Sequence, residues 1–223
     1  MSGSVFRDSA LANNPAWAQL LGLCPLLAVS NNVANALGLA AASALVMIGA
    51  NGTIAALRRH IPDFARLPCF VLIIATFTTI ALLVLQALAY EIYLKIALFV
   101  QIIVTNCMIL GRAEAFASRQ PVGAALADAA GTAAGFALAL VVLGATRELL
   151  ATGGLLAGME SLLGPVAAGW HFRLADSGLL LAALPPGAFI VAGLLLAAMN
   201  AGGRWYRQRR GATPEPSEEH EAT

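Results

Sequence analysis

Long apolar runs that are poor in charge dominate this chain and limit the folds open to it. Hydrophobic residues make up 59% of the 223 residues and charged residues only 11%, with a mean hydropathy of +0.79. A bilayer span needs roughly 20 apolar residues, and the runs add up to about six spans. We therefore predict an all-α integral membrane protein with six transmembrane helices. The net charge of +1 gives no indication of nucleic-acid binding.

Short polar segments separate the expected spans. The spans are predicted over about residues 15–33, 36–57, 68–89, 92–110, 123–143 and 185–203. Residues 1–13 are expected to form a cytoplasmic N-terminal segment, and residues 208–223 a disordered cytoplasmic tail. An outer loop is expected over about residues 147–180, where Arg147 and Glu148 should pair at the outer interface.

The distribution of basic residues predicts the orientation of the spans. Of the 13 lysines and arginines, six spans place only Lys95, Arg147 and Arg173 on one side of the membrane and the other ten on the opposite side. Loops rich in Lys and Arg face the cytoplasm. Both termini are therefore expected in the cytoplasm.

Two of the apolar runs carry a cysteine next to an interruption of the helical pattern. In LGLCPLLAVSNN, Cys24 lies between Gly22 and Pro25. In QIIVTNCMILGRAEAFA, Cys107 follows a Thr-Asn pair that ends in Asn106. Irregular backbone is tolerated at membrane depth only where protein or a cavity covers it. We expect the two interruptions to face each other near the membrane midplane.

The order of spans predicts an internal repeat. Residues 14–90 and 91–207 each contain a first span broken at a cysteine, a second span rich in small residues and a third span preceded by proline. Because each half has an odd number of spans, the second half must lie inverted relative to the first. The predicted fold is thus two inverted three-helix repeats.

The cysteines allow two interpretations. A lone cysteine in a transmembrane helix is most often a small apolar residue, and Cys69 fits this role. For Cys24 and Cys107, the shared interruptions leave both the apolar role and a ligand role open. Iron-sulfur clusters and thiolate zinc sites commonly take four cysteines, so this pair would need a partner with a similar half-site. An electron carrier explains burial at the midplane better than structural zinc does.

Four other polar residues are candidates for ion or partner contacts: Asn106, Arg112, Glu114 and Asp128. Ionisable residues within membrane spans are often functional. The alternative is that Arg112 and Glu114 mark the interfacial end of a helix. For Asp128, a solvated or capped carboxylate near the cytoplasmic surface is the preferred interpretation.

Four motifs in the sequence are familiar: NPAWAQLLGLCPLLAVS, VTNCMILGRAEAFAS, LGATRELLATG and LPPGAFI. They resemble the membrane subunit family shared by the Rnf electron transport complex and the Na⁺-translocating NADH:quinone reductase. The resemblance covers about residues 14–210. The Cys24-Pro25 pair, the ESLLG segment and the LPPGAF element are most similar to the E-type subunits of Rnf complexes.

The resemblance implies a function that the residues alone do not give. In that family, two homologous six-helix subunits of opposite topology each supply two cysteines to a [2Fe-2S] cluster buried between them. The matching residues here are Cys24 and Cys107, and the implied homologous partner is the A-type subunit of the Rnf complex. The complex is a bacterial inner-membrane ferredoxin:NAD⁺ oxidoreductase that moves Na⁺ or H⁺.

The resemblance also implies the other partners. Electrons would pass through the cluster between the B-type subunit in the cytoplasm and the G-type subunit on the outer side, and the C- and D-type subunits complete the complex. Ferredoxin and NAD(H) would be reached only through other subunits, and the chain alone would have no activity. Two alternatives stay open: an ion-conducting subunit without a cofactor, whose breaks would offer polar ligands, and a scaffold without a cofactor.

Overall fold

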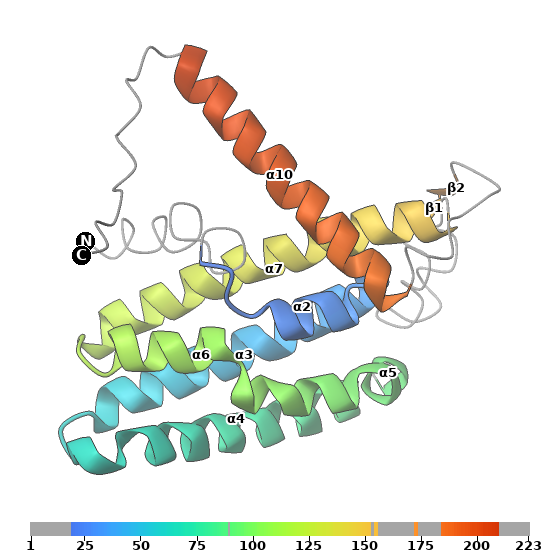
Figure 1. Ribbon diagram of the computed structural model, residues 1–223. Coiled ribbons are helices and arrows are strands. Elements are labelled where there is room, and N and C mark those ends of the chain that lie inside the picture. Colours follow the sequence, from blue (N-terminus) through green and yellow to red (C-terminus); the bar gives the residue numbers. More distant parts are fainter. Residues whose placement is uncertain (1–18, 89, 153, 156–171, 174–183, 210–223) are drawn as a thin grey trace.

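The structure is a bundle of α-helices (Figure 1). It is a computed structural model that describes residues 19–88, 90–152, 154–155, 172–173 and 184–209. The predicted N-terminal segment, most of the predicted outer loop and the predicted tail lie outside the described residues. The helices are α2 (Leu23–Val29), α3 (Val33–Leu57), α4 (Arg66–Leu88), α5 (Tyr90–Gln101), α6 (Cys107–Arg112), α7 (Val122–Thr152) and α10 (Pro185–Arg209).

Short elements connect these helices. Two 3₁₀ segments, η2 (Asp63–Ala65) and η3 (Ile102–Thr105), precede α4 and α6, and a π-helical turn, η4 (Ala113–Ala117), continues α6. Two short strands, β1 (Gly154–Leu155) and β2 (Phe172–Arg173), form an antiparallel pair. This pair is the one departure from an all-α fold in the part of the chain that the structure describes.

Four segments within the described residues are long and apolar enough to cross a membrane. They are Val33–Leu57, Arg66–Leu88, Tyr93–Ala117 and Val122–Thr152. The apolar part of α10, Pro185–Ala201, is shorter. Of the first predicted span, only the seven-residue α2 is described as a helix. The protein is therefore a multi-pass helical membrane protein.

The helices α3 and α7 form the centre of the bundle. In their most apolar stretches, 61% of α3 and 56% of α7 is buried, against 22% of α4. A Cβ built on Gly144 would lie 3.2 Å from Cβ of Ala36, and one built on Gly52 would lie 3.0 Å from Leu126. The start of each helix therefore faces the end of the other, and small residues let the two antiparallel backbones approach closely.

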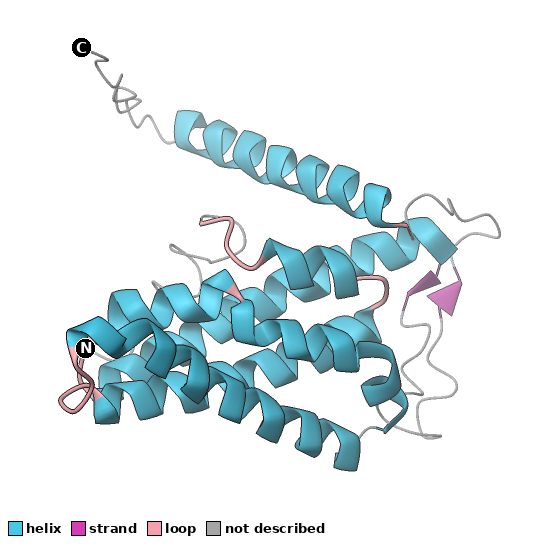
Figure 2. Ribbon diagram, turned by 60° about the horizontal axis from the view of Figure 1, so that its bottom comes forward, coloured by secondary structure: helices cyan, strands magenta, loops and turns pink. Residues whose placement is uncertain are grey.

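The outer helices cover only part of this centre. Both α4 and α5 contact α3, and α4 leaves large apolar side chains such as Leu72 and Leu83 exposed. An exposed apolar face of this size fits contact with lipid or another subunit. Only the N-terminal half of α10 has buried residues with described side chains, among them Ala188 and Val191. Figure 2 shows α10 diverging from the bundle beyond that point.

The end of α7 corrects one prediction. Residues 147 and 148 were expected to open an outer loop, but α7 continues through them to Thr152. Both side chains are buried within the bundle, so their charges do not mark the surface of the molecule. A helix can carry such charges inside when other segments supply partners for them.

The contact between α3 and α4 can be tested at Gly49. A Cβ on Gly49 would overlap the ring of Phe77, whereas a Cβ on Gly193 of α10 would meet nothing within 4 Å. We expect Gly49→Ala to lower the free energy of unfolding by about 1–3 kcal/mol, the usual range for overpacking. Thermal unfolding of the detergent-purified protein measures this loss. The control Gly193→Ala should unfold at the wild-type temperature or above, and equal midpoints for the two variants would contradict the packing argument.

Candidate functional site

The first cysteine lies in the first turn of α2, directly after a sharp turn of the backbone. Gly22 has φ +77°, in the left-handed region where glycine carries no steric cost. Pro25 is tolerated near the start of α2 because the first N–H groups of a helix have no partner within it. The turn and the proline therefore start a new helix just before Cys24. The Cys24 side chain is exposed.

The second cysteine is the first residue of α6. The 3₁₀ segment η3 ends at Asn106, whose backbone is extended, with φ −66° and ψ 116°. The side chain of Asn106 then caps α6, because its Oδ1 accepts a hydrogen bond from the N–H of Met108 at 3.0 Å. The Cys107 side chain is exposed as well. A helix thus begins one residue before Cys24, and another begins at Cys107.

The starts of α2 and α6 are in contact. The backbone N–H of Gly22 donates a hydrogen bond to Sγ of Cys107 at 3.2 Å. A Cβ built on Gly22 would lie 3.3 Å from Oδ1 of Asn106. Consecutive Cα atoms are 3.80 Å apart, so Cα of Cys24 lies within about 7.6 Å of Cα of Gly22. Two thiols that are distant in sequence therefore share one neighbourhood.

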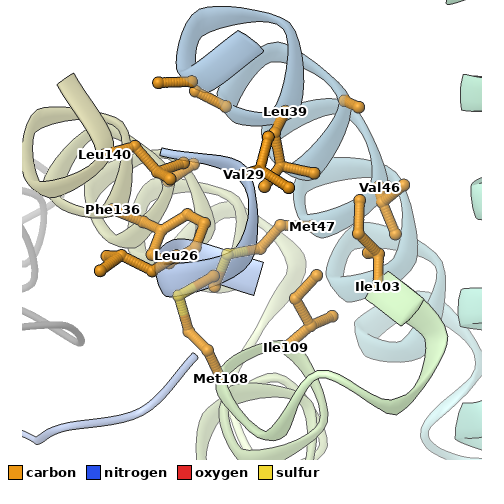
Figure 3. Packing of buried hydrophobic residues seen from close by; sticks show 14 of the residues in the cluster. Leu26, Val29, Leu39, Val46, Met47, Ile103, Met108, Ile109, Phe136 and Leu140 are labelled. Carbon is orange, nitrogen blue, oxygen red and sulfur yellow. The ribbon is translucent and has the colours of Figure 1, made fainter. Parts of the chain in front are cut away.

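The starts of α2 and α6 pack against one apolar core. Figure 3 shows Leu26 of α2 and Met108 of α6 among side chains from α3 and α7, including Met47 and Phe136. Leu26 is 1% exposed, and Met108 and Phe136 are fully buried. The short helices α2 and α6 thus bury one face against α3 and α7, while their cysteines are exposed. Cys69 lies apart in the first turn of α4 and is half-buried.

The charged residues after Cys107 are paired within the chain. Arg112 forms an ion pair with Asp128 of α7, in which Nε donates to Oδ2 at 3.0 Å. Nη2 of Arg66 lies 3.5 Å from Oε1 of Glu114. Asp128 is only 1% exposed. Of the expected solvated or capped carboxylate, the solvated form is wrong: Asp128 is buried, and its ion pair with Arg112 offsets the cost of burial. This pair fastens α6 to α7.

Two charged residues of α7 form hydrogen bonds with the end of α2 and the start of α3, and the sequence interpretation missed this role. Arg147 is fully buried and donates through Nη1 to the carbonyl of Leu27 at 3.0 Å and to Oγ of Ser30 at 2.9 Å. Glu148 is 1% exposed and accepts a hydrogen bond from the N–H of Val33 at 2.9 Å. These side chains satisfy backbone groups at the end of α2 and the start of α3.

The expected position of Arg147 and Glu148 at the outer interface is therefore corrected: both side chains are buried and reach inward to the turn between α2 and α3. Nη2 of Arg147 also lies 3.4 Å from the carbonyl of Leu184, just before α10. One signal in the sequence could have indicated this. The apolar pattern resumes directly after the two charges, in Leu149 and Leu150, so the helix had no reason to stop there.

The described residues offer few groups that could bind a metal ion. Among the residues that the structure describes, no group of three or more His, Cys, Asp or Glu side chains is placed to hold a metal ion. Asn106 is 3% exposed, and its Nδ2 has no hydrogen-bond partner among these residues. The four sequence candidates thus divide into one cap, Asn106, and three members of internal ion pairs.

The fold is that of a multi-pass helical membrane protein in which the starts of α2 and α6, each with an exposed cysteine, are in contact. Residues 3–196 match the family described as "Rnf-Nqr subunit, membrane protein". The chain belongs to this Rnf-Nqr family. The match covers α2 to the middle of α10, including both cysteine-bearing segments.

Relatives within the family are close. The chain is 51% identical over 190 residues to the E subunit of an ion-translocating oxidoreductase complex from Pseudoalteromonas atlantica, and the match covers 84% of this chain and 82% of the relative. It is 50% identical over 198 residues to the protein of the same name from Pseudomonas paraeruginosa, with 88% and 83% covered. The corresponding E subunit from Shewanella amazonensis is 51% identical, with 84% and 82% covered.

The turn before Cys24 can be tested at Gly22. We expect Gly22→Ala to lower the free energy of unfolding by about 1–2 kcal/mol, the cost of a left-handed conformation for a residue with a Cβ. The added methyl would also press on Phe136 at 3.2 Å. The matched control is Gly111→Ala in α6, where a Cβ would meet nothing within 4 Å. Chemical unfolding in mild detergent compares the two, and a Gly22 variant as stable as the control would disprove the strained turn.

The role of Arg147 can be tested by its replacement with glutamine. The shorter, neutral side chain leaves the Leu27 carbonyl and the Ser30 hydroxyl without their donor, at roughly 1–3 kcal/mol for each buried group left unpaired. Amide hydrogen exchange should accelerate in α2 while that of α4 stays near wild type. Arg59→Gln, at an exposed arginine, is the control. Unchanged exchange in α2 would show that Arg147 does not hold this half-helix.

Proposed function

We propose that this chain is a membrane subunit of an Rnf-type ion-translocating ferredoxin:NAD⁺ oxidoreductase complex. In this proposal, Cys24 and Cys107 supply half the ligands of an intramembrane [2Fe-2S] cluster. Family membership and the names of the relatives support the complex. The observation that carries the ligand role is the 3.2 Å hydrogen bond from the Gly22 N–H to Sγ of Cys107, which joins the starts of the two cysteine-bearing helices.

The donor set fits such a cluster. Thiolates are the usual ligands of [2Fe-2S] clusters, and four are commonly required. Cys24 and Cys107 are both exposed, so a partner that presents a similar pair could approach them. The homologous A-type subunit of the Rnf complex is the partner that the family resemblance implies. The chain's two sulfurs would then form one side of a shared site.

The chain's own residues would hold these sulfurs and tune them. When bound, a [2Fe-2S] cluster accepts and returns one electron at a time. A hydrogen bond from a backbone N–H to a ligand sulfur withdraws negative charge from it, and such bonds help set cluster potentials. The Gly22 N–H is in position to do this for Cys107. The apolar floor of Leu26, Met108 and Phe136 would keep water away from one side of the site.

We also propose the six-helix inverted repeat. The antiparallel α3 and α7 are the second helices of the two repeats, as a two-fold axis in the membrane plane would require. A further correspondence supports it. Arg147, near the end of α7, donates to the carbonyl of Leu27 in the first cysteine-bearing segment. Arg58, just after α3, donates to the carbonyl of Arg119 beyond the second, at 3.0 Å. In each case an arginine of one repeat donates a hydrogen bond to a backbone carbonyl of the other repeat.

The remaining parts of the proposal follow from this assignment. Both termini lie in the cytoplasm, and the chain is a multi-pass protein of the bacterial inner membrane. The B-, C-, D- and G-type subunits complete the complex, and ferredoxin and NAD(H) bind to other subunits. Electron passage through the shared site is coupled to movement of Na⁺ or H⁺. The chain has no activity outside the complex.

An ion-conducting subunit without a cofactor is less well supported. Polar ligands should then be available at both breaks. At the second break, Oδ1 of Asn106 is engaged with the N–H of Met108, and at the first break Gly22 brings no side chain. The two carboxylates that follow the second break, Glu114 and Asp128, are paired with Arg66 and Arg112. The thiols are thus the exposed ligand groups that the two breaks share.

The ligand role is tested by replacing each cysteine in the assembled complex. Cys24→Ala and Cys107→Ala should each remove the cluster, because loss of one of four thiolates opens the site. The measurement is iron and acid-labile sulfide per purified complex, together with the electron paramagnetic resonance signal of the reduced sample. Cys69→Ala is the matched control, since that cysteine lies apart in α4.

The outcomes separate the candidates. A drop of about two iron atoms per complex in both variants, with Cys69→Ala unchanged, supports the proposal. An unchanged iron content per complex in either variant would disprove the ligand assignment. A complex that keeps its activity while both cysteines react freely with maleimide would instead favour a scaffold.

A further inference from the structure

A basic pocket lies at the end of the bundle opposite Arg147. It is a cavity of about 170 Å³ lined by Arg58, Ile61, Arg66, Phe70, Ser118 and Arg119. These residues come from the end of α3, the start of α4 and the turn between η4 and α7. Liquid water takes about 30 Å³ per molecule, so the cavity has room for a phosphate group. We call this cavity the basic pocket.

The basic pocket carries excess positive charge. Arg58 is held in place, because its Nη1 donates to the carbonyl of Arg119. Arg66 lies 3.5 Å from Glu114 and 6.0 Å from the centre of the Phe70 ring. Arg119 is exposed, and its guanidinium makes no ion pair with a carboxylate among the described residues. Arg58 and Arg119 thus line the pocket without an ion pair to a carboxylate among the described residues, and a phosphate could accept hydrogen bonds from both.

The surroundings of the basic pocket are apolar and exposed. Phe64, in the 3₁₀ turn before α4, is 91% exposed, and the adjacent Leu67 is 55% exposed. Leu57, at the end of α3, is 44% exposed. In membrane proteins, apolar and aromatic side chains beside basic residues at the ends of spans mark the lipid interface. A free phosphate ion or an acidic peptide would make no use of this apolar rim.

We propose that the basic pocket binds the headgroup phosphate of an anionic phospholipid. The planar guanidinium groups of Arg58 and Arg119 would donate to the phosphate oxygens, a geometry for which arginine is well suited. The acyl chains would lie along the apolar side chains of Leu57 and Leu67. Basic pockets between membrane helices bind acidic headgroups in this way.

A bound lipid would join two parts of the chain. Arg58 directly follows α3 and Arg66 begins α4, whereas Ser118 and Arg119 end the segment that begins at Cys107. The existing bond from Arg58 to the Arg119 carbonyl is single and exposed. A phosphate held by both arginines would strengthen this link. The lipid would therefore help to fix the helical segment that follows Cys107.

The test uses the full-length chain purified from its native membrane with its co-purifying subunits. Native mass spectrometry follows the binding of phosphatidylglycerol after delipidation, with phosphatidylcholine as the uncharged comparison. Arg119→Gln should weaken phosphatidylglycerol binding by about tenfold, which is the equivalent of roughly 1.4 kcal/mol. The Arg119 carbonyl, which Arg58 binds, is unchanged in this variant, so the fold should persist. Arg59→Gln is the control, because Arg59 is exposed but does not line the pocket.

Several results would overturn the proposal. Equal weakening by Arg59→Gln would show that the lipid responds to diffuse surface charge. Equal binding of phosphatidylcholine would remove the role of headgroup charge. Displacement of phosphatidylglycerol by millimolar inorganic phosphate would assign the pocket to a free anion. Loss of a co-purifying subunit from Arg119→Gln, with lipid binding intact, would assign it to an acidic protein partner.

Discussion

A helix end that is buried among other helices leaves backbone groups that apolar side chains cannot satisfy, and the rest of this structure depends on how these groups are paired. Side chains supply the partners, some from distant segments and one from the residue just before α6. Glu148 accepts from the N–H of Val33, Asn106 caps α6, and Sγ of Cys107 accepts from the N–H of Gly22. Without these partners, each interruption would cost several kcal/mol by the estimates for unpaired buried polar groups.

The central pair of α3 and α7 makes this pairing possible. Their small residues let the backbones approach, and their buried faces form the floor under both half-helices. Asp128, near the beginning of α7, pairs with Arg112 of α6. Arg147, near the end of α7, donates to the carbonyl of Leu27 in α2. A single rigid helix thus sets the distance between the two fastenings.

The sequence predicted the parts of the fold that depend on local chemistry. Apolar length located α3 and α4 to within a few residues, and the Thr-Asn pair before Cys107 coincides with the extended residue between η3 and α6. The two misjudged residues, Asp128 and Arg147, were judged by their charge alone. Their partners lie 16 and as many as 120 residues away in sequence, and local patterns carry no information about such contacts.

The position of Arg147 has a consequence for biosynthesis. The guanidinium that closes the turn after α2 belongs to a residue 120 positions downstream of Leu27. During membrane insertion, the early half-helix therefore emerges from the ribosome long before its clamp exists. Until α7 arrives, the Leu27 carbonyl and the Ser30 hydroxyl must be satisfied by water or by the insertion machinery. Cys24 is consequently the first thiol to be synthesised. Its segment is among the last to be fixed, because Arg147 also binds the carbonyl of Leu184, just before α10.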